Sequence, residues 1–252
     1  MEQKKSTQEI PQRTKQHLFK VLQAADAKRK YRWAIDVYEH YRKVYSFDDA
    51  LDYRLALLYD HLVIFKIEKL LDKTKKQKFL KKYLKKAENI YRAIVKRNPD
   101  YHLAFHGLSR VYQARAQYRK AIMYAKRAYA LLKKLPKKRR GVLGIGNVFL
   151  LAGDHKNAEK WFKKELNDLG KNHLGANANV MMFYLQTNNL KKGLPYALKT
   201  EKLLTSELAK PIYRGVNTGS SNKTIGLLRK RIDKIKQFNS HMKNKQPTVG
   251  GL

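Results

Sequence analysis

Three features of this sequence could carry chemistry: two spaced histidines, a glycine-rich stretch and clusters of lysine. His102 and His106 are four residues apart, and on a helix this spacing can present two imidazoles to one metal ion. No third histidine, cysteine or HExxH glutamate accompanies them, so we interpret both as surface or groove residues. The stretch GVLGIGN, residues 141–147, lacks the Lys-Ser/Thr pair of a phosphate-binding loop. We therefore expect no nucleotide, metal or other cofactor.

Other catalytic groups are sparse. The chain has no cysteine, which excludes disulfides, thiol catalysis and cysteine-ligated metals. Its 20 acidic residues are scattered, which disfavours a carboxylate pair for acid–base catalysis. The sequence therefore predicts a protein that is not an enzyme and has no small-molecule substrate.

Positive charge is in large excess. The 56 lysines and arginines give a formal net charge of +36, which attracts polyanions such as nucleic acid, anionic lipid or an acidic protein surface. A run of lysines can also be a solvated face, and a host whose proteins are all basic would give the same excess, so these alternatives stay open. The residues expected to contact a polyanion are Lys78, Lys81, Lys82, Lys85, Lys137, Lys138, Arg139, Arg140, Arg229, Lys230 and Arg231.

The elements that must position these side chains recur along the chain. Five small residues follow one another at separations of 53, 34, 37 and 35 positions: Ala34, Ala87, Ala121, Ala158 and Gly193. Upstream of each, apolar residues recur at intervals of three and four, which indicates the buried face of a helix. The unit is therefore a helix, a tight turn and a second helix. In LAGDHKNAEKWF, residues 151–162, we expect Gly153 and Asp154 to close the turn, Ala158 to be the helix crossing and Phe162 to fill the gap above it.

This pattern resembles the tetratricopeptide repeat motif over roughly residues 16–204. The third unit supplies Phe105, Leu108, Tyr112, Ala116, Tyr118, Ala121 and Ala128, and the fourth supplies Ile145, Gly146, Phe149, Gly153, Ala158 and Phe162. The resemblance implies an all-α fold, an α-solenoid of about five helix-turn-helix units forming a right-handed superhelix with a C-terminal capping helix. It also implies a concave groove, lined by the first helix of each unit, that holds an extended or helical peptide.

The resemblance also nominates residues for the groove. Carried over one position at a time, they are Asp60, His106, Arg110, Gln113, Asn147, Leu150, Asn179 and Met182. Asn147 and Asn179 fall at the two asparagine positions of a family subtype that grips the C-terminal carboxylate of chaperones. Leu143 stands where that subtype has a cation, and no sixth unit supplies its remaining basic pair, so the subtype fits poorly.

The expected organisation has five parts. Residues 1–12 are predicted to be disordered, 13–210 to form the repeats, 211–222 a loop, 223–239 a basic amphipathic capping helix and 240–252 a disordered tail. The second unit is predicted to be lengthened around residues 67–86. Pro195 lies inside the expected second helix of the fifth unit and should delay or kink it. No apolar run reaches the roughly 20 residues of a bilayer-spanning helix, so we expect a cytoplasmic protein.

The sequence is compatible with two alternative functions. The first is a non-enzymatic adaptor that binds a partner peptide or protein in the groove, with basic flanks that favour an acidic partner or an anionic assembly. The second is an RNA- or ribosome-binding repeat protein that uses the lysine-rich edge. Binding to a membrane surface is the least favoured. For the basic amphipathic helix at 223–239, binding to a membrane surface or to nucleic acid stays open as the alternative to capping.

Overall fold

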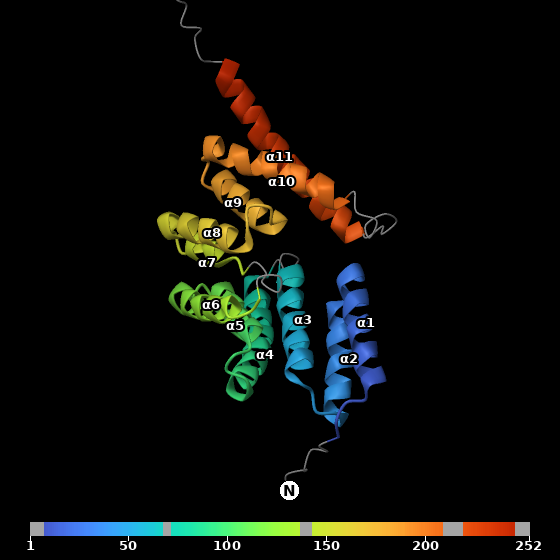
Figure 1. Cartoon of the computed structure of the whole chain (residues 1–252). Helices are drawn as coiled ribbons and strands as arrows, with labels where there is room; N and C mark the ends of the chain where they lie inside the picture. Colours follow the sequence, from blue (N-terminus) through green and yellow to red (C-terminus); the bar gives the residue numbers. More distant parts are fainter. Residues whose placement is uncertain (1–7, 68–71, 137–142, 209–218, 245–252) are drawn as a thin grey trace, which may run out of the picture. The chain divides into compact units, whose positions relative to one another are not determined.

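The computed structural model describes residues 8–67, 72–136, 143–208 and 219–244 (Figure 1). The chain divides into two compact units, residues 1–134 and 135–252, and each is described by itself. Every regular element in the described ranges is an α-helix. In unit 1 each helix packs against the next along the chain. Its helices are α1 (Gln12–Lys28), α2 (Tyr31–Val44), α3 (Asp49–Ile67), α4 (Lys73–Arg97), α5 (His102–Ala114) and α6 (Tyr118–Lys133).

Unit 2 continues the same pattern of paired helices. The pairs α7 with α8 and α9 with α10 pack together, α8 contacts α9, and α11 packs on α10. The helices are α7 (Ile145–Leu151), α8 (His155–Leu169), α9 (Leu174–Gln186), α10 (Leu190–Leu208) and α11 (Gly219–Asn244). The predicted all-α solenoid of five helix pairs followed by one further helix is confirmed for the described chain.

The turns inside the pairs repeat the same geometry. Four pairs turn on one residue in the left-handed region, with φ between 52° and 79°: Arg29, Ala116, Gly153 and Asn188. The N–H of the following residue then bonds to a carbonyl five positions back. The four bonds, 2.8–3.1 Å long, are Lys30 to Ala25, Gln117 to Tyr112, Asp154 to Phe149 and Asn189 to Tyr184. The register read from the sequence is therefore reproduced by the backbone.

The predicted crossing residues are buried. Ala34, Ala87 and Ala121 in unit 1 and Ala158 in unit 2 have no exposed surface. Phe162 fills the space that the small residues leave, and it lies so close to Gly146 that a Cβ at that glycine would meet the ring at 2.6 Å. In the turn before them, Asp154 caps α8 by accepting a hydrogen bond from the backbone N–H of Asn157 at 3.0 Å. The predicted packing of this stretch is thus confirmed.

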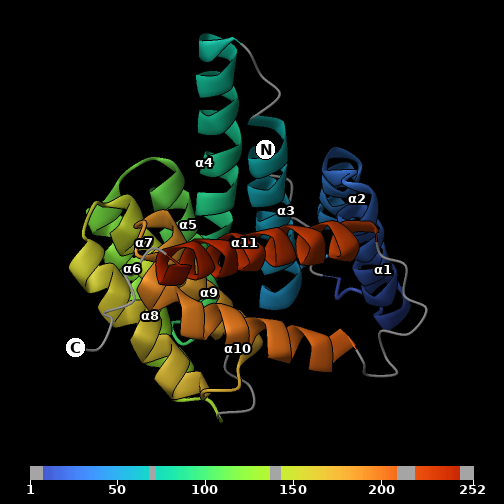
Figure 2. The ribbon, with the colours of Figure 1, turned by 90° about the horizontal axis from the view of Figure 1, so that it is seen from above.

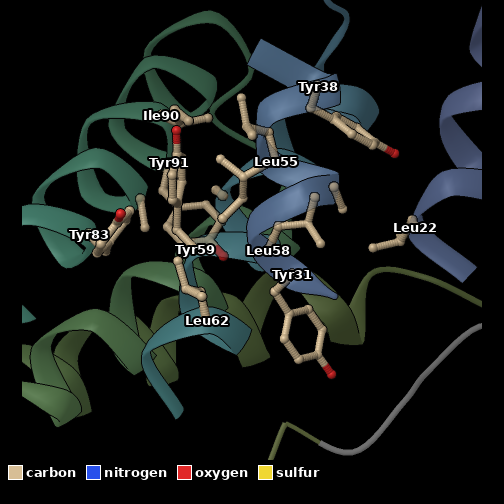
Figure 3. Close-up of a cluster of buried hydrophobic side chains, with 14 of the residues drawn as sticks. Leu22, Tyr31, Tyr38, Leu55, Leu58, Tyr59, Leu62, Tyr83, Ile90 and Tyr91 are labelled. Carbon is tan, nitrogen blue, oxygen red and sulfur yellow. The ribbon is translucent and has the colours of Figure 1, made fainter. Parts of the chain in front are cut away.

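Three tyrosines are among the largest buried side chains in the core of unit 1 (Figure 3): Tyr38, Tyr59 and Tyr91 are at most 2% exposed. Their hydroxyls all find acceptors, as burial requires. Tyr38 donates to the carbonyl of Leu18 at 2.9 Å and Tyr59 donates to Glu39. These three tyrosines are therefore part of the core of unit 1.

Helix α11 covers one side of unit 2. Ile232 and Ile235 are buried in a cluster with Met181, Leu190 and Ala197. Two polar contacts fix the same side of α11: Lys236 pairs with Glu201 at 3.1 Å, and the amide of Asn239 donates to the carbonyl of Leu190 at 3.2 Å. These contacts are those of a helix that covers an otherwise open apolar face.

Several predicted boundaries need correction. Residues 8–11 are not disordered, because the N–H of Ser46 donates to the carbonyl of Gln8 at 3.1 Å. Helix α11 includes positions 219–222, predicted as loop, and 240–244, predicted as disordered tail. Helix α10 contains Pro195 but begins at Leu190, so its start is not delayed. The extra residues of the second repeat lengthen α3 to 19 residues and α4 to 25.

Candidate partner-binding surface

The first helices of the three repeats in unit 1 share one face. Helix α3 contacts both α1 and α5. Between α1 and α3, the guanidinium of Arg54 lies over the ring of Phe19, 4.4 Å from its centroid, and His61 Nδ1 lies 3.2 Å from Asp26 Oδ1. Between α3 and α5, Arg110 lies 3.7 Å from the carboxylate of Asp60. We define the groove face of unit 1 as Phe19, Arg54, His61, His106, Arg110 and Gln113.

Asp60, predicted as a groove residue, is largely covered by its neighbours. Its side chain is only 4% exposed, so little of it is accessible at the surface of unit 1. It accepts a hydrogen bond from the hydroxyl of Tyr91 at 2.9 Å, and Arg110 lies on its open side. Burial raises the pKa of Asp60 to about 6, although the nearby Arg110 and the bond from Tyr91 act in the opposite direction. Asp60 therefore pairs with Arg110 across the contact between α3 and α5.

The α5 residues of the groove face lie on one side of that helix. His106, Arg110 and Gln113 follow at intervals of four and three, and all three are half-buried. On α3, burial lowers the pKa of His61, and this effect outweighs the bond to Asp26. The arginines of the groove face are Arg54 and Arg110, and the carboxylates of Asp26 and Asp60 are held by His61, Tyr91 and Arg110.

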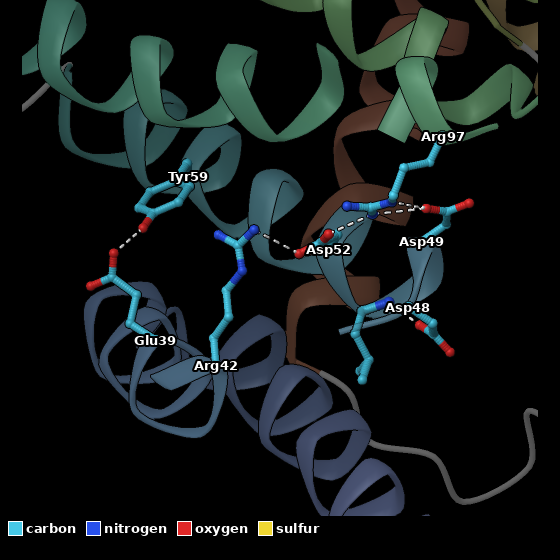
Figure 4. Close-up of polar contacts among 8 residues, drawn as sticks. Glu39, Arg42, Asp48, Asp49, Asp52, Tyr59 and Arg97 are labelled. Atoms are coloured by element: carbon cyan, nitrogen blue, oxygen red, sulfur yellow. Dashed lines mark hydrogen bonds and ion pairs between the residues drawn. The ribbon is translucent and has the colours of Figure 1, made fainter. Parts of the chain in front are cut away.

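A second polar cluster lies where α2 and α4 meet the start of α3 (Figure 4). Asp52, 2% exposed, is paired with Arg42 at 3.1 Å and with Arg97 at 2.7 Å, and Arg97 also bonds to Asp49 at 2.8 Å. A hollow of about 330 Å³ opens beside Asp52, Arg42 and Arg97. Because both guanidinium groups are already held by carboxylates, this cluster ties the first repeat to the second.

The groove residues predicted in unit 2 are distributed differently. Asn147 on α7 is exposed and Leu150 is half-buried. On α9, Asn179 and Met182 are half-buried, and Met182 packs against the cluster that contains Ile232 of α11. The apolar part of the predicted groove therefore contributes in part to the internal packing of unit 2.

The predicted polyanion contacts fall into three groups. Lys78, Lys81, Lys82 and Lys85 lie on α4 and are exposed, as are Arg229, Lys230 and Arg231 on α11. Lys137, Lys138, Arg139 and Arg140 lie outside the described residues. Only the group on α4 forms part of unit 1 together with the groove face.

Metal-binding side chains do not gather within the described ranges, where no cluster of three or more His, Cys, Asp or Glu residues is placed to hold a metal ion. His102, considered above as one of a metal-binding pair, is half-buried, and burial lowers its pKa. Among the helices described, none combines the length and the apolar character that crossing a bilayer requires.

Comparisons with known proteins agree with the repeat geometry. No protein-family model and no curated protein sequence matches this chain. The solved structure of TTC0263, a thermophilic TPR protein from Thermus thermophilus, superposes with a TM-score of 0.60 at 18% identity, over 88% of this chain and 98% of that one. MamA from MSR-1 is 18% identical over 75% of this chain and 94% of its own, with a TM-score of 0.42. The repeated motif, the four equivalent turns and the similarity to TTC0263 show that this chain has the tetratricopeptide-repeat fold.

Proposed function

We propose that this protein is a non-enzymatic adaptor that binds an acidic segment of a partner protein on the groove face of unit 1. The observation that carries the proposal is the placement of Arg110, which is 27% exposed and held by the buried Asp60. A guanidinium whose position is fixed before binding loses less conformational entropy when it meets a carboxylate. The tetratricopeptide-repeat fold supports a role in protein interaction.

The chemistry of the groove face favours an extended acidic segment with occasional apolar residues. Arg54 and Arg110 provide two cations, His106 and Gln113 provide further polar groups, and Phe19 provides an aromatic ring beneath Arg54. The net charge of +36 accelerates the encounter with a negatively charged partner. In unit 2, the exposed Asn147 and the half-buried Leu150, Asn179 and Met182 are proposed as partner-binding residues of that unit.

A peptide-display selection tests this proposal. Random peptides of about a dozen residues are selected on the folded protein, and the affinity of an enriched peptide is then measured for two variants. Arg110→Gln should weaken binding about 10- to 100-fold, because a hydrogen bond to a charged group contributes roughly 1.5–3 kcal/mol. The matched control is Arg119→Gln, which removes the same charge from an exposed position on α6.

Each outcome of this binding experiment either supports or contradicts the proposal. Enrichment of Asp and Glu, with binding lost in Arg110→Gln and kept in Arg119→Gln, supports the groove face. Equal affinities for the two variants, with both melting like the wild type, would show that net charge and not this face determines binding.

A further inference from the structure

A row of lysines runs along the outer side of α4. Lys75, Lys78, Lys82, Lys85 and Lys96 follow at helical spacing, and all are exposed. They lie opposite the buried side of the helix, which contains Leu84, Ala87, Tyr91 and Ile94. We call this row the lysine ridge. At 1.5 Å per residue it extends for about 32 Å from its first to its last lysine.

The charges of the lysine ridge are not balanced locally. From Lys73 to Ala87 the sequence has eight lysines and no acidic residue. Neighbouring Lys86 pairs with Glu39 at 2.7 Å, whereas no acidic side chain of the described ranges forms an ion pair with Lys75, Lys78, Lys82 or Lys85.

This arrangement costs the helix stability. Like charges three or four residues apart destabilise a helix by roughly 0.2–0.5 kcal/mol for each pair. The lysines of the first turn also oppose the helix dipole, which only the N-cap residue Asp72 complements, by accepting a hydrogen bond from the backbone N–H of Lys75 at 2.6 Å. Apart from Lys82, whose ammonium lies 5.6 Å from the ring centroid of Tyr83, these lysines make few contacts that would offset the repulsion, which favours a role in binding.

The surroundings of the lysine ridge point to one kind of occupant. The only large apolar side chains among the first ten residues of α4, Phe79 and Leu80, are half-buried and pack against the hydrophobic core of unit 1. A protein interface needs an apolar or aromatic centre, and a membrane-bound helix inserts apolar side chains. A nucleic-acid backbone requires only cations, and single-strand binding would add exposed aromatic residues for stacking. We propose that the lysine ridge binds the phosphodiester backbone of a nucleic-acid duplex.

Two features of unit 1 suit this assignment. Figure 2 shows the N-terminal part of α4 extending beyond α3 and α5, and its lysines at positions 75, 78 and 82 are exposed. Lysine is a point charge without the fork geometry that reads base edges, so binding is independent of base sequence. The lysine ridge is also separate from the groove face, so the two proposals can fail independently.

Salt-dependent binding to labelled 20-base-pair duplexes, one of DNA and one of RNA, tests the proposal by fluorescence anisotropy. The test variant carries Lys75→Gln, Lys78→Gln, Lys82→Gln and Lys85→Gln. The control carries Lys160→Gln, Lys171→Gln, Lys191→Gln and Lys202→Gln, four exposed lysines of unit 2. Both variants lose four positive charges. Removing four phosphate contacts should reduce the magnitude of the slope of log Kobs against log salt by about 3.5. Between 50 and 200 mM salt, the affinity of the test variant should therefore fall by a factor roughly a hundredfold smaller than the fall for the wild type.

The control variant should keep the slope of the wild type, with either duplex. The test variant should melt at or slightly above the wild-type temperature, because repulsion along α4 is removed. Equal slopes for the two variants would overturn the proposal. Two further assays are sedimentation with phosphatidylserine vesicles and binding to a polyglutamate peptide. If one of these depends on the lysine ridge while duplex binding does not, the proposal is overturned. The ridge would then be assigned to a membrane or to an acidic protein.

Discussion

Gly107→Ala should lower the free energy of unfolding of unit 1 by about 2 kcal/mol. A Cβ at this position would lie 2.3 Å from Cζ of Tyr91. The ring cannot move away cheaply, because it is fully buried and its hydroxyl satisfies the buried Asp60. Overpacking of this kind costs typically about 1–3 kcal/mol and sometimes more. The better helix propensity of alanine returns at most about 1 kcal/mol, so the clash dominates.

Gly226→Ala is the matched control for this prediction. Gly226 is also helical, in α11, and among the described residues a Cβ there would meet no atom within 4 Å outside the backbone of its own helix. Alanine at this position should raise stability slightly, by up to about 1 kcal/mol. Urea unfolding of the two variants beside the wild type gives both differences. If both substitutions stabilise the protein, the close contact of α4 with α5 is wrong.

The stability of unit 2 should fall as the pH rises from about 5 to 8, and Glu165→Gln should remove much of this fall. Glu165 is 4% exposed and accepts hydrogen bonds from the backbone N–H groups of Leu143 at 3.1 Å and Gly144 at 3.0 Å. Its other oxygen, Oε2, is buried and has no hydrogen-bond partner among the described residues. Burial raises the pKa of Glu165 to about 7, and the backbone bonds only partly offset this effect.

The sign follows from proton binding. Between the ordinary pKa of 4.5 and the folded value of about 7, the folded chain holds a proton that the unfolded chain has lost. The free energy of unfolding therefore decreases across this window, by about 3 kcal/mol at most, since each pKa unit corresponds to 1.36 kcal/mol. Above this window Glu165 is ionised in both states, and its contribution no longer changes.

Urea unfolding of the wild type and Glu165→Gln at pH 5 and pH 8 measures the effect. Glutamine keeps a carbonyl oxygen for Leu143 and Gly144 but cannot ionise, so the variant should be the more stable protein at pH 8 by about 2–3 kcal/mol. At pH 5 the two should be similar. Asp60, whose pKa is also raised, is common to both proteins and cancels in the comparison. Parallel stability curves would contradict the assignment.

The sequence pattern correctly predicted the structural features that are determined by residues close together in the chain. The turn at Gly153 and Asp154 and the helix crossing at Ala158 could be read from spacing, because turn geometry and helix periodicity are local properties. The length of α11 was underestimated at both ends, since helix boundaries depend weakly on local sequence.

Contacts between distant residues could not be read in this way. Nothing in the sequence pairs Gly107 with Tyr91, because that contact joins helices of successive repeats. Glu165 looks like any other charged residue of a lysine-rich helix, and its role depends on a backbone segment more than 20 residues earlier. The predicted groove residues did gather on first helices, but Asp60 is buried because Tyr91 and Arg110 compensate its charge.

The central claim is that the first helices of unit 1 present the partner-binding face. Site-specific photo-crosslinking tests this claim most directly. A benzoylphenylalanine is placed at Gln113 on α5 or at Met123, which is 55% exposed on α6, and each protein is irradiated with a display-selected peptide. The account expects a crosslink from position 113 and none from position 123. A crosslink from position 123 alone would contradict it.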